Sequence, residues 1–262
     1  MRVGVDGREV YCYTGTRAVD PARPTIVFVH GAGNDHSVFA LQSRYFAHHR
    51  RNVLAVDLPG HGRSAGPPLG SVEAIADWIA GLMDAAGIGE AALVGHSLGA
   101  LAALEAAARH PSRITRIALL GPAIPMAVAD ALLEAARVDD HVAFELIAGW
   151  SHSPARQIGG NPVPGMWMMG QTLRLMERSR PGALYSDLRA CQAYANGLAA
   201  ARDVRCPALL VVGARDLMAP PKAAQGLAAA LAEKRVTTLP ECGHAMMAEQ
   251  PDAVLDALAA FL

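Results

Sequence analysis

The segment Ala91–Gly99, with the sequence AALVGHSLG, carries the pattern that decides the fold of this chain. Its first residues are small and apolar, as in a buried strand, and an alanine-rich segment of helical period follows from Leu98 to His110. Ser97 therefore stands at a turn between a strand and a helix. Gly95 and Gly99 flank this turn, and glycines remove the side chains that would clash in so sharp a bend. A serine exposed in this way is a candidate nucleophile, although a plain turn serine is the alternative.

Short apolar segments alternate with longer helical ones along most of the chain, which is typical of an α/β fold with a parallel sheet covered by helices. An antiparallel pair is expected first, because Asp6-Gly7 suits the positive φ angles of a hairpin turn. Buried parallel strands are predicted at Thr25–His30, Val53–Asp57, Ala91–Gly95, Ile114–Leu120, Ala208–Gly213 and Arg235–Leu239. Covering helices are predicted at Val38–His48, Ser71–Ala86, Leu98–His110, Pro221–Leu231 and Pro251–Leu262.

The alternation stops between Gly121 and Arg205. Helical patterns in this stretch are interrupted by several prolines and glycines, and strand propensity resumes at Ala208. We therefore predict a single domain over residues 1–262, with an inserted segment at 122–205 that sits on top of the sheet.

Composition narrows the classes of function. The chain has 262 residues, with 23 Lys and Arg against 24 Asp and Glu, so a cationic surface for phosphate backbones is not expected. Its 4 cysteines form no Cys-x-x-Cys pair, which argues against a zinc site and a dense disulfide framework. No apolar stretch approaches the roughly 18 residues of a membrane span, and the N-terminus lacks the apolar run of a secretory signal. We expect a cytoplasmic protein without metal or cofactor that binds neither nucleic acid nor membrane.

A serine is a poor nucleophile at its free pKa and needs a base that a third group orients. His244 is the candidate base, because it follows the strand predicted at Arg235–Leu239, at the sheet edge where ligand sites gather. Asp216 is the candidate orienting acid, since it follows the strand predicted at Ala208–Gly213. The position after the preceding strand, residues 121–125, has the sequence GPAIP and holds no carboxylate. The alternatives are a structural loop histidine and a surface-turn aspartate.

Acyl transfer also needs donors that face the developing oxyanion, and backbone N–H groups serve because they are fixed before the reaction. One expected donor is the N–H of Leu98, the residue after the candidate nucleophile. The other is the N–H of Ala32, in the sequence HGAG at residues 30–33, which follows a predicted strand. A glycine-rich turn without a ligand is the alternative for this second segment.

These motifs resemble those of the α/β-hydrolase superfamily over nearly the full chain. The resemblance rests on HGAG at 30–33, DLPGHGRS at 57–64, GHSLG at 95–99, Gly213 with Asp216 and Pro220, and Gly243-His244 with Glu249, Pro251 and Phe261-Leu262. The order Ser97, Asp216, His244 is the chain order of the superfamily's catalytic triad. The resemblance implies a mostly parallel eight-stranded sheet flanked by helices, with a helical lid after the sixth strand that matches residues 122–205. It gives residues 57–64 only a structural role.

The resemblance further implies a serine hydrolase that cleaves carboxylic esters through an acyl-enzyme on Ser97. Haloalkane dehalogenases and epoxide hydrolases of similar fold use an aspartate at that position, so Ser97 excludes both. A carbon–carbon bond hydrolase acting on a diketone would use the same triad and stays open, as do a non-catalytic ligand receptor and a perhydrolase side activity. The expected partner is a small-molecule ester with a small to medium, mainly apolar acyl group, bound by a monomer or homodimer.

Bulky apolar residues of the inserted segment are candidates for the wall of an acyl pocket. Flexible methionines suit a wall that accepts several acyl shapes, although the same residues would also form a small core between lid helices. The candidate substrate-binding residues are Trp150, Met166, Trp167 and Met169, together with Met218 outside the segment. Four basic residues of the segment are candidates for binding an anionic substrate or carrier, and a solvated helix face is the alternative. They are Arg174, Arg178, Arg180 and Arg189.

Overall fold

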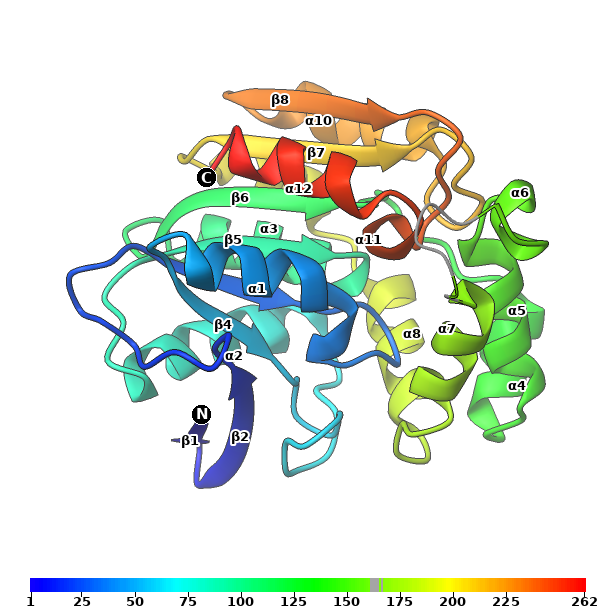
Figure 1. The fold of residues 1–262 in the computed structure, drawn as a ribbon, viewed down its shortest axis with the longest axis horizontal. Helices are drawn as coiled ribbons and strands as arrows, with labels where there is room; N and C mark the ends of the chain where they lie inside the picture. The colour runs from blue at the N-terminus through cyan, green and yellow to red at the C-terminus, as the bar shows by residue number, and fades with distance from the viewer. Residues whose placement is uncertain (161–164, 166) are drawn as a thin grey trace.

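The computed structural model describes residues 1–160, 165 and 167–262, and it contains an eight-stranded sheet in the order β1-β2-β4-β3-β5-β6-β7-β8 (Figure 1). The strands are β1 (Arg2–Val5), β2 (Arg8–Tyr13), β3 (Thr25–Val29), β4 (Asn52–Val56), β5 (Ala91–His96), β6 (Ile114–Leu120), β7 (Ala208–Gly213) and β8 (Lys234–Leu239). The first two pairs in this order, β1 with β2 and β2 with β4, are antiparallel, and the remaining pairs are parallel. The predicted mostly parallel eight-stranded sheet is confirmed.

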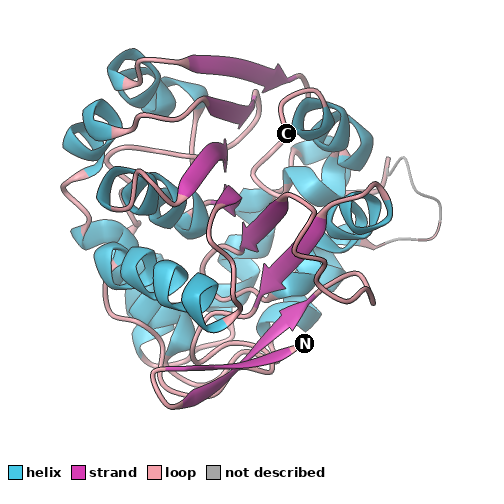
Figure 2. Ribbon diagram, turned by 90° about the vertical axis from the view of Figure 1, so that its left-hand side faces the viewer, coloured by secondary structure: helices cyan, strands magenta, loops and turns pink. Residues whose placement is uncertain are grey.

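Helices cover both faces of the sheet (Figure 2). On one face lie α1 (Ala40–His48) and α12 (Pro251–Ala259), which pack together, and on the other lie α2 (Val72–Ala85), α3 (Leu98–Arg109) and α10 (Gln225–Ala230). Successive strand residues point to opposite faces, so β3 supplies both cores. Ile26 and Phe28 join the core with α1 and α12, while Val27 and Val29 join the core with α2 and α3.

The last strand differs from the prediction. The sequence predicts a buried strand at Arg235–Leu239, but most of β8 is exposed, and Val236 is 53% exposed. The reason is position, because β8 ends the sheet and pairs only with β7. An edge strand leaves backbone groups unpaired on one side, and exposed charged residues such as Lys234 and Arg235 discourage another chain from pairing there.

The segment between β6 and β7 is helical. It contains α4 (Asp130–Arg137), α5 (Val142–Ser151), α6 (Pro154–Gln157), α7 (Met168–Met176), α8 (Ala183–Ala193) and α9 (Gly197–Asp203). Helices α4 to α8 lie beyond the carboxyl ends of the parallel strands (Figure 1), and α4, α5, α7 and α8 share a small apolar core of their own. Helix α9 instead packs against α3 and α10, so the expected boundary at Arg205 includes one helix that covers the sheet.

Across the described part of the chain, every helix is too short or too polar to cross a membrane.

Candidate active site

Ser97 occupies a strained turn between β5 and α3. The strand ends at His96 and the helix begins at Leu98, and Ser97 between them has φ 53° and ψ −117°. A residue with a side chain rarely adopts a positive φ, and such strain persists where the surrounding structure enforces it. A Cβ atom on Gly95 would collide with the backbone of Gly99, and one on Gly99 with the backbone of Val29. Both glycines are therefore needed for the turn to close.

His244 and Asp216 form a buried hydrogen-bonded pair. His244 Nδ1 donates to Asp216 Oδ2 at 2.7 Å, and Asp216 Oδ1 accepts from the N–H groups of Met218 at 2.8 Å and Ala219 at 2.7 Å. Burial alone would raise the pKa of the Asp216 carboxyl, but His244 and the two N–H donors outweigh it and lower that pKa. The ionised carboxylate holds the hydrogen on Nδ1 and leaves Nε2 of His244 as the free nitrogen.

Gly121 makes room for this pair, a feature that the sequence analysis did not identify. A Cβ atom on Gly121 would lie 2.9 Å from Cε1 and 3.0 Å from Nδ1 of His244, and the residue has φ +59°. Gly121 directly follows β6, whose carboxyl end faces the same sheet edge. The signal in the sequence is that residue 121 is a glycine, at a position after a strand where the orienting carboxylate could otherwise stand.

His96 supports the backbone of His244. The Nε2–H of His96 donates to the carbonyl oxygen of His244 at 2.9 Å, and the two rings lie 4.6 Å apart. Burial, together with the nearby His244, lowers the pKa of His96 to about 3. His96 therefore stays neutral, and it does not add a second positive charge beside a protonated His244.

Glu249 anchors the loop that carries His244. Its buried carboxylate accepts the N–H of Gly243 at 3.0 Å and the hydroxyl of Ser153 at 2.6 Å. Ser153 lies between α5 and α6, so this contact also ties the loop to the helices beyond the sheet edge. The backbone adds a second tie, because the N–H of Ala245 donates to the carbonyl oxygen of Ser151 at 2.8 Å.

The expected oxyanion donors lie beside Ser97. A Cβ atom on Gly31 would lie 3.1 Å from Cβ of Ser97, so the 30–33 loop runs next to the serine. Among hydrogen bonds between described residues, the Ala32 N–H donates none. Leu98 is the first residue of α3, where N–H groups have no partner within the helix.

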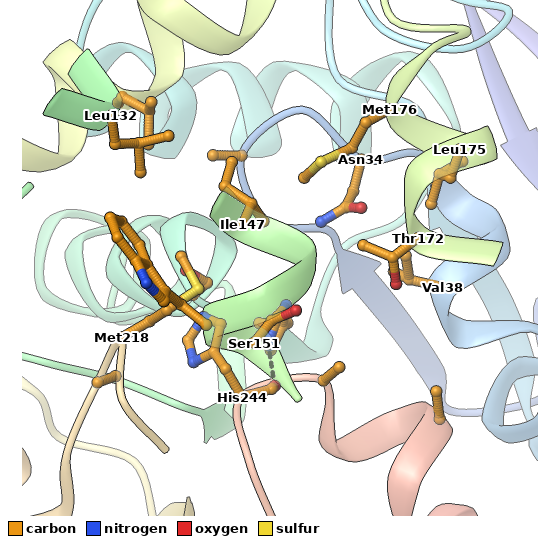
Figure 3. A pocket seen from close by; sticks show the side chains of 18 of the residues that line it. Asn34, Val38, Leu132, Ile147, Ser151, Thr172, Leu175, Met176, Met218 and His244 are labelled. Atoms are coloured by element: carbon orange, nitrogen blue, oxygen red, sulfur yellow. Dashed lines mark hydrogen bonds between the residues drawn. The ribbon is translucent and has the colours of Figure 1, made fainter. Parts of the chain in front are cut away.

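A cavity of about 500 Å³ lies between the sheet edge and the helices beyond it (Figure 3). Ser97, His244 and Ala32 line it, and the rest of its wall is mostly apolar. Figure 3 shows its walls, with Leu132 from α4, Ile147 and Ser151 from α5, and Thr172 and Leu175 from α7. Asp216 lies behind His244 and outside this lining.

The candidate substrate-binding residues divide between the cavity and other places. Trp150 and Met218 line the cavity. Trp167 is 67% exposed and lies against Gly170, and neither Trp167 nor Met169 belongs to the described lining, so the expected pocket role does not fit these two residues. Met166 lies outside the described residues.

Helix α7 presents a different face to the cavity from the one expected. Met168, Thr172 and Leu175 line it, at the i, i+4 and i+7 spacing of one helical face. Met169 lies on the next face of the same helix, and Trp167 precedes the helix start. The helical spacing of Met168 with Leu175 was the signal available in the sequence.

Arginines stand at the cavity and around it. Arg174 and Arg178 belong to the lining, and the part of the chain that the structure describes contributes no Asp or Glu to it. Arg174 pairs with Glu177 at 2.5 Å, and Arg178 with Asp35 at 3.3 Å. The other two basic residues do not line the cavity: Arg180 donates to the carbonyl oxygen of Ser64 at 2.8 Å, and Arg189 is exposed.

Asp57 has the contacts of a structural residue. It is fully buried and accepts the N–H groups of His36 at 2.8 Å and Arg63 at 2.9 Å, and Nδ1 of His36 at 2.7 Å. Asp35, His36 and Asp57 lie close enough to share a metal ion, but hydrogen bonds already satisfy both oxygens of Asp57. These contacts hold the turn at residues 57–64.

Comparison with known proteins identifies the family. The model of the Alpha/beta hydrolase family matches residues 26–257, so the chain belongs to this family. It is 32% identical over 247 residues to the pimeloyl-[acyl-carrier protein] methyl ester esterase of Chromobacterium violaceum, covering 91% of this chain and 94% of that protein. It is 31% identical over 262 residues to the 2-(acetamidomethylene)succinate hydrolase of Mesorhizobium japonicum, covering 91% of this chain and 88% of that protein.

A solved structure shares the whole fold. The enol-lactonase of Burkholderia xenovorans LB400 superposes with a TM-score of 0.86 at 26% identity, covering 100% of this chain and 99% of that one. The chain belongs to the α/β-hydrolase family, has esterase relatives and carries Ser97 at the turn between β5 and α3. It is therefore a serine ester hydrolase.

Proposed function

We propose that this enzyme cleaves carboxylic esters through an acyl-enzyme on Ser97, with His244 as the base and Asp216 as the orienting carboxylate. The observation that carries the proposal is the 2.7 Å hydrogen bond between His244 Nδ1 and Asp216 Oδ2, beside a cavity that Ser97 and His244 line together. This bond leaves Nε2 of His244 free to accept a proton on the cavity side.

The reaction follows from this geometry. Ser97 Oγ attacks the ester carbonyl and transfers its proton to His244 Nε2, and the carbonyl electrons move to the oxygen. The N–H groups of Ala32 and Leu98 donate to this oxyanion. Collapse of the tetrahedral intermediate expels the alcohol, which takes the proton from His244. A water molecule, activated by the same base, then hydrolyses the acyl-serine.

The proposed substrates carry small to medium, mainly apolar acyl groups. A cavity of about 500 Å³ falls within the usual range for small-molecule sites, and its wall is mostly apolar. We propose that the segment at residues 122–205 acts as the lid, because more than half of the described lining residues come from it. Because Arg174 and Arg178 line the cavity and one relative is a pimeloyl-[acyl-carrier protein] methyl ester esterase, methyl esters of dicarboxylic acids belong in the substrate panel, as monomethyl dicarboxylates.

We also infer a cytosolic enzyme that works as a monomer or homodimer. The four cysteines, Cys12, Cys191, Cys206 and Cys242, all lie in the described part of the chain and are free thiols, as is usual in a reducing compartment. The proposed mechanism uses the side chains and backbone of this chain, without a metal or cofactor. Size-exclusion chromatography with light scattering tests the oligomeric state.

A substrate panel tests the proposed activity. Purified enzyme is assayed with p-nitrophenyl esters from acetate to octanoate, with monomethyl dicarboxylates and with a vinylogous diketone. We expect hydrolysis of the esters and its loss in the Ser97→Ala variant, with folding unchanged. Cleavage of the diketone alone would replace ester hydrolysis by carbon–carbon bond hydrolysis. Unchanged ester turnover in the variant would place the nucleophile elsewhere.

A further inference from the structure

A buried carboxylate of α8 lies against the loop that carries Ala32. Asp187 is 1% exposed, and its Oδ2 accepts the N–H of Gly33 at 2.9 Å and Nε2 of His61 at 2.9 Å. Helix α8 belongs to the segment between β6 and β7, whereas Gly33 directly follows Ala32 after β3. The same helix also packs on the loop through Leu184, whose Cδ1 would lie 3.0 Å from a Cβ atom on Gly33.

His61 has the surroundings of a protonated imidazole. Its Nδ1 donates to the carbonyl oxygen of Pro59 at 3.0 Å, and its Nε2 donates to Asp187, so both ring nitrogens face acceptors. Burial opposes the positive charge on His61, but the Asp187 carboxylate outweighs it and raises the pKa of His61. The hydrogen bond to His61 thus fixes the orientation of the Asp187 carboxyl group, whose Oδ2 also accepts from Gly33.

The peptide groups on both sides of Ala32 are fixed. The carbonyl oxygen of Gly31 accepts from His30 Nδ1 at 2.9 Å and from the N–H of Asn34 at 3.2 Å. In a trans peptide the N–H points opposite to the carbonyl, so the Ala32 N–H points away from these donors. On the other side of Ala32, Asp187 holds the N–H of Gly33. The Ala32 N–H, without an acceptor among the described residues, is left oriented for a ligand.

We propose that Asp187 is a positioning residue that holds the oxyanion donor Ala32 in place through Gly33. The proposal rests on the proposed function, because that function gives Ala32 its role. An oxyanion donor contributes only when its N–H is fixed before charge develops, and a misplacement of about 1 Å can cost about 100-fold in rate. Through Asp187, helix α8 thereby fixes the position of the Ala32 N–H. Asp187 does this without touching the substrate.

Two substitutions separate positioning from simple packing. Asp187→Asn keeps an oxygen that can accept both N–H groups, whereas Asp187→Leu removes the acceptor at similar volume. For the Leu variant we expect kcat to fall about 10- to 100-fold with KM within about twofold, and for the Asn variant we expect kcat within about fivefold of wild type. Equal kcat in wild type and the Leu variant would overturn the proposal. Equal losses in both variants would also overturn it, because they would indicate a structural need for the charge.

The matched control is Glu105, another carboxylate that is 1% exposed. It accepts from Tyr194 Oη at 2.6 Å and Asn196 Nδ2 at 2.9 Å, away from the 30–33 loop. Glu105→Gln and Glu105→Leu should lower stability while leaving kcat unchanged for the folded enzyme. A kcat loss as large in Glu105→Leu as in Asp187→Leu would contradict a specific role for Asp187.

A tetrahedral inhibitor gives a readout that packing alone does not move. Ser97 adds to a trifluoromethyl ketone to form a hemiketal oxyanion, while the corresponding alcohol binds the cavity without one. Asp187→Leu should weaken inhibition by the ketone by the same factor as it lowers kcat/KM and leave binding of the alcohol unchanged. Equal weakening of both compounds would overturn the proposal.

A double variant addresses folding. If Asp187→Leu does not fold, His61→Leu with Asp187→Leu replaces the buried ion pair by apolar side chains, a change that proteins often tolerate. The same kcat loss is expected in it, and wild-type kcat would overturn the proposal. An inactive wild-type enzyme that the trifluoromethyl ketone does not bind would instead defeat the proposed function itself.

Discussion

His244 Nδ1 lies 2.7 Å from Asp216 Oδ2, and the side chains of both residues are almost fully buried. Because Asp216 Oδ1 is held by two backbone N–H groups, the carboxylate cannot rotate without losing hydrogen bonds. The pair therefore fixes which nitrogen of His244 faces the cavity and in which tautomer.

The first prediction concerns this tautomer. Asp216→Asn keeps the shape of the side chain but presents an amide that can donate to Nδ1 and thereby move the imidazole hydrogen to Nε2. His244 would then be unable to accept the Ser97 proton, so kcat should fall about 10⁴-fold, as for the equivalent change in other triads. The measurement is kcat on a p-nitrophenyl ester, with the melting temperature as a check on folding. A loss below about tenfold would contradict the role of Asp216.

The second prediction concerns the space beside His244. Gly121→Ala adds a methyl group 2.9 Å from Cε1 of His244, in addition to the strain of φ +59°, and should destabilise the fold by about 1–3 kcal/mol and lower kcat. Gly87→Ala is the control, because Gly87 has φ +69° and nothing within 4 Å of an added Cβ. It should lower stability by only about 1–2 kcal/mol and leave kcat unchanged. Equal kcat in the two variants would show that Gly121 has no part in placing His244.

The third prediction concerns pH and stability. The pKa of His61 is raised in the folded chain, so its contribution to stability is complete below its unfolded-state pKa and is lost as pH rises through the folded-state value. Wild type and His61→Gln are compared by urea unfolding at about pH 6 and about pH 9. The stability advantage of wild type should be larger at the lower pH. An advantage that is constant or grows with pH would contradict the ion pair with Asp187.

The fourth prediction concerns acyl length. Thr172 lines the cavity from α7, so Thr172→Trp should shorten the accepted acyl chain and lower kcat/KM for octanoyl relative to acetyl esters by about tenfold or more. Trp167→Ala is the control, because Trp167 is 67% exposed and lies outside the described lining. It should leave the ratio unchanged. A shift of the ratio by Trp167→Ala alone would place the acyl group elsewhere.

Local patterns made much of the fold predictable. The strand, serine and helix at residues 91–109 are encoded by neighbouring residues, so their periods and glycines identify them directly. The edge position of β8 was not predictable in this way, because it depends on the order of strands across the sheet. For α7 the helical spacing of Met168, Thr172 and Leu175 marks a common face, but the packing of α7 on α5 decides that this face turns toward the cavity.

The supporting residues of the site were harder to predict than the candidate catalytic residues. Ser97, Asp216 and His244 each follow a strand at one sheet edge, which local sequence can indicate. Asp187 and Gly33 are 154 residues apart, and only the packing of α8 on the loop brings them together. Contacts of this kind leave no periodic signal in the sequence.

The most direct test of the central claim is covalent labelling of Ser97. The folded enzyme is treated with a fluorophosphonate, and the modified residue is located by mass spectrometry of the intact chain and its peptides. We predict one adduct per chain, on Ser97, and none in Ser97→Ala. Absence of an adduct in the folded wild-type enzyme, or an adduct on another residue, would contradict the assignment of Ser97 as the nucleophile.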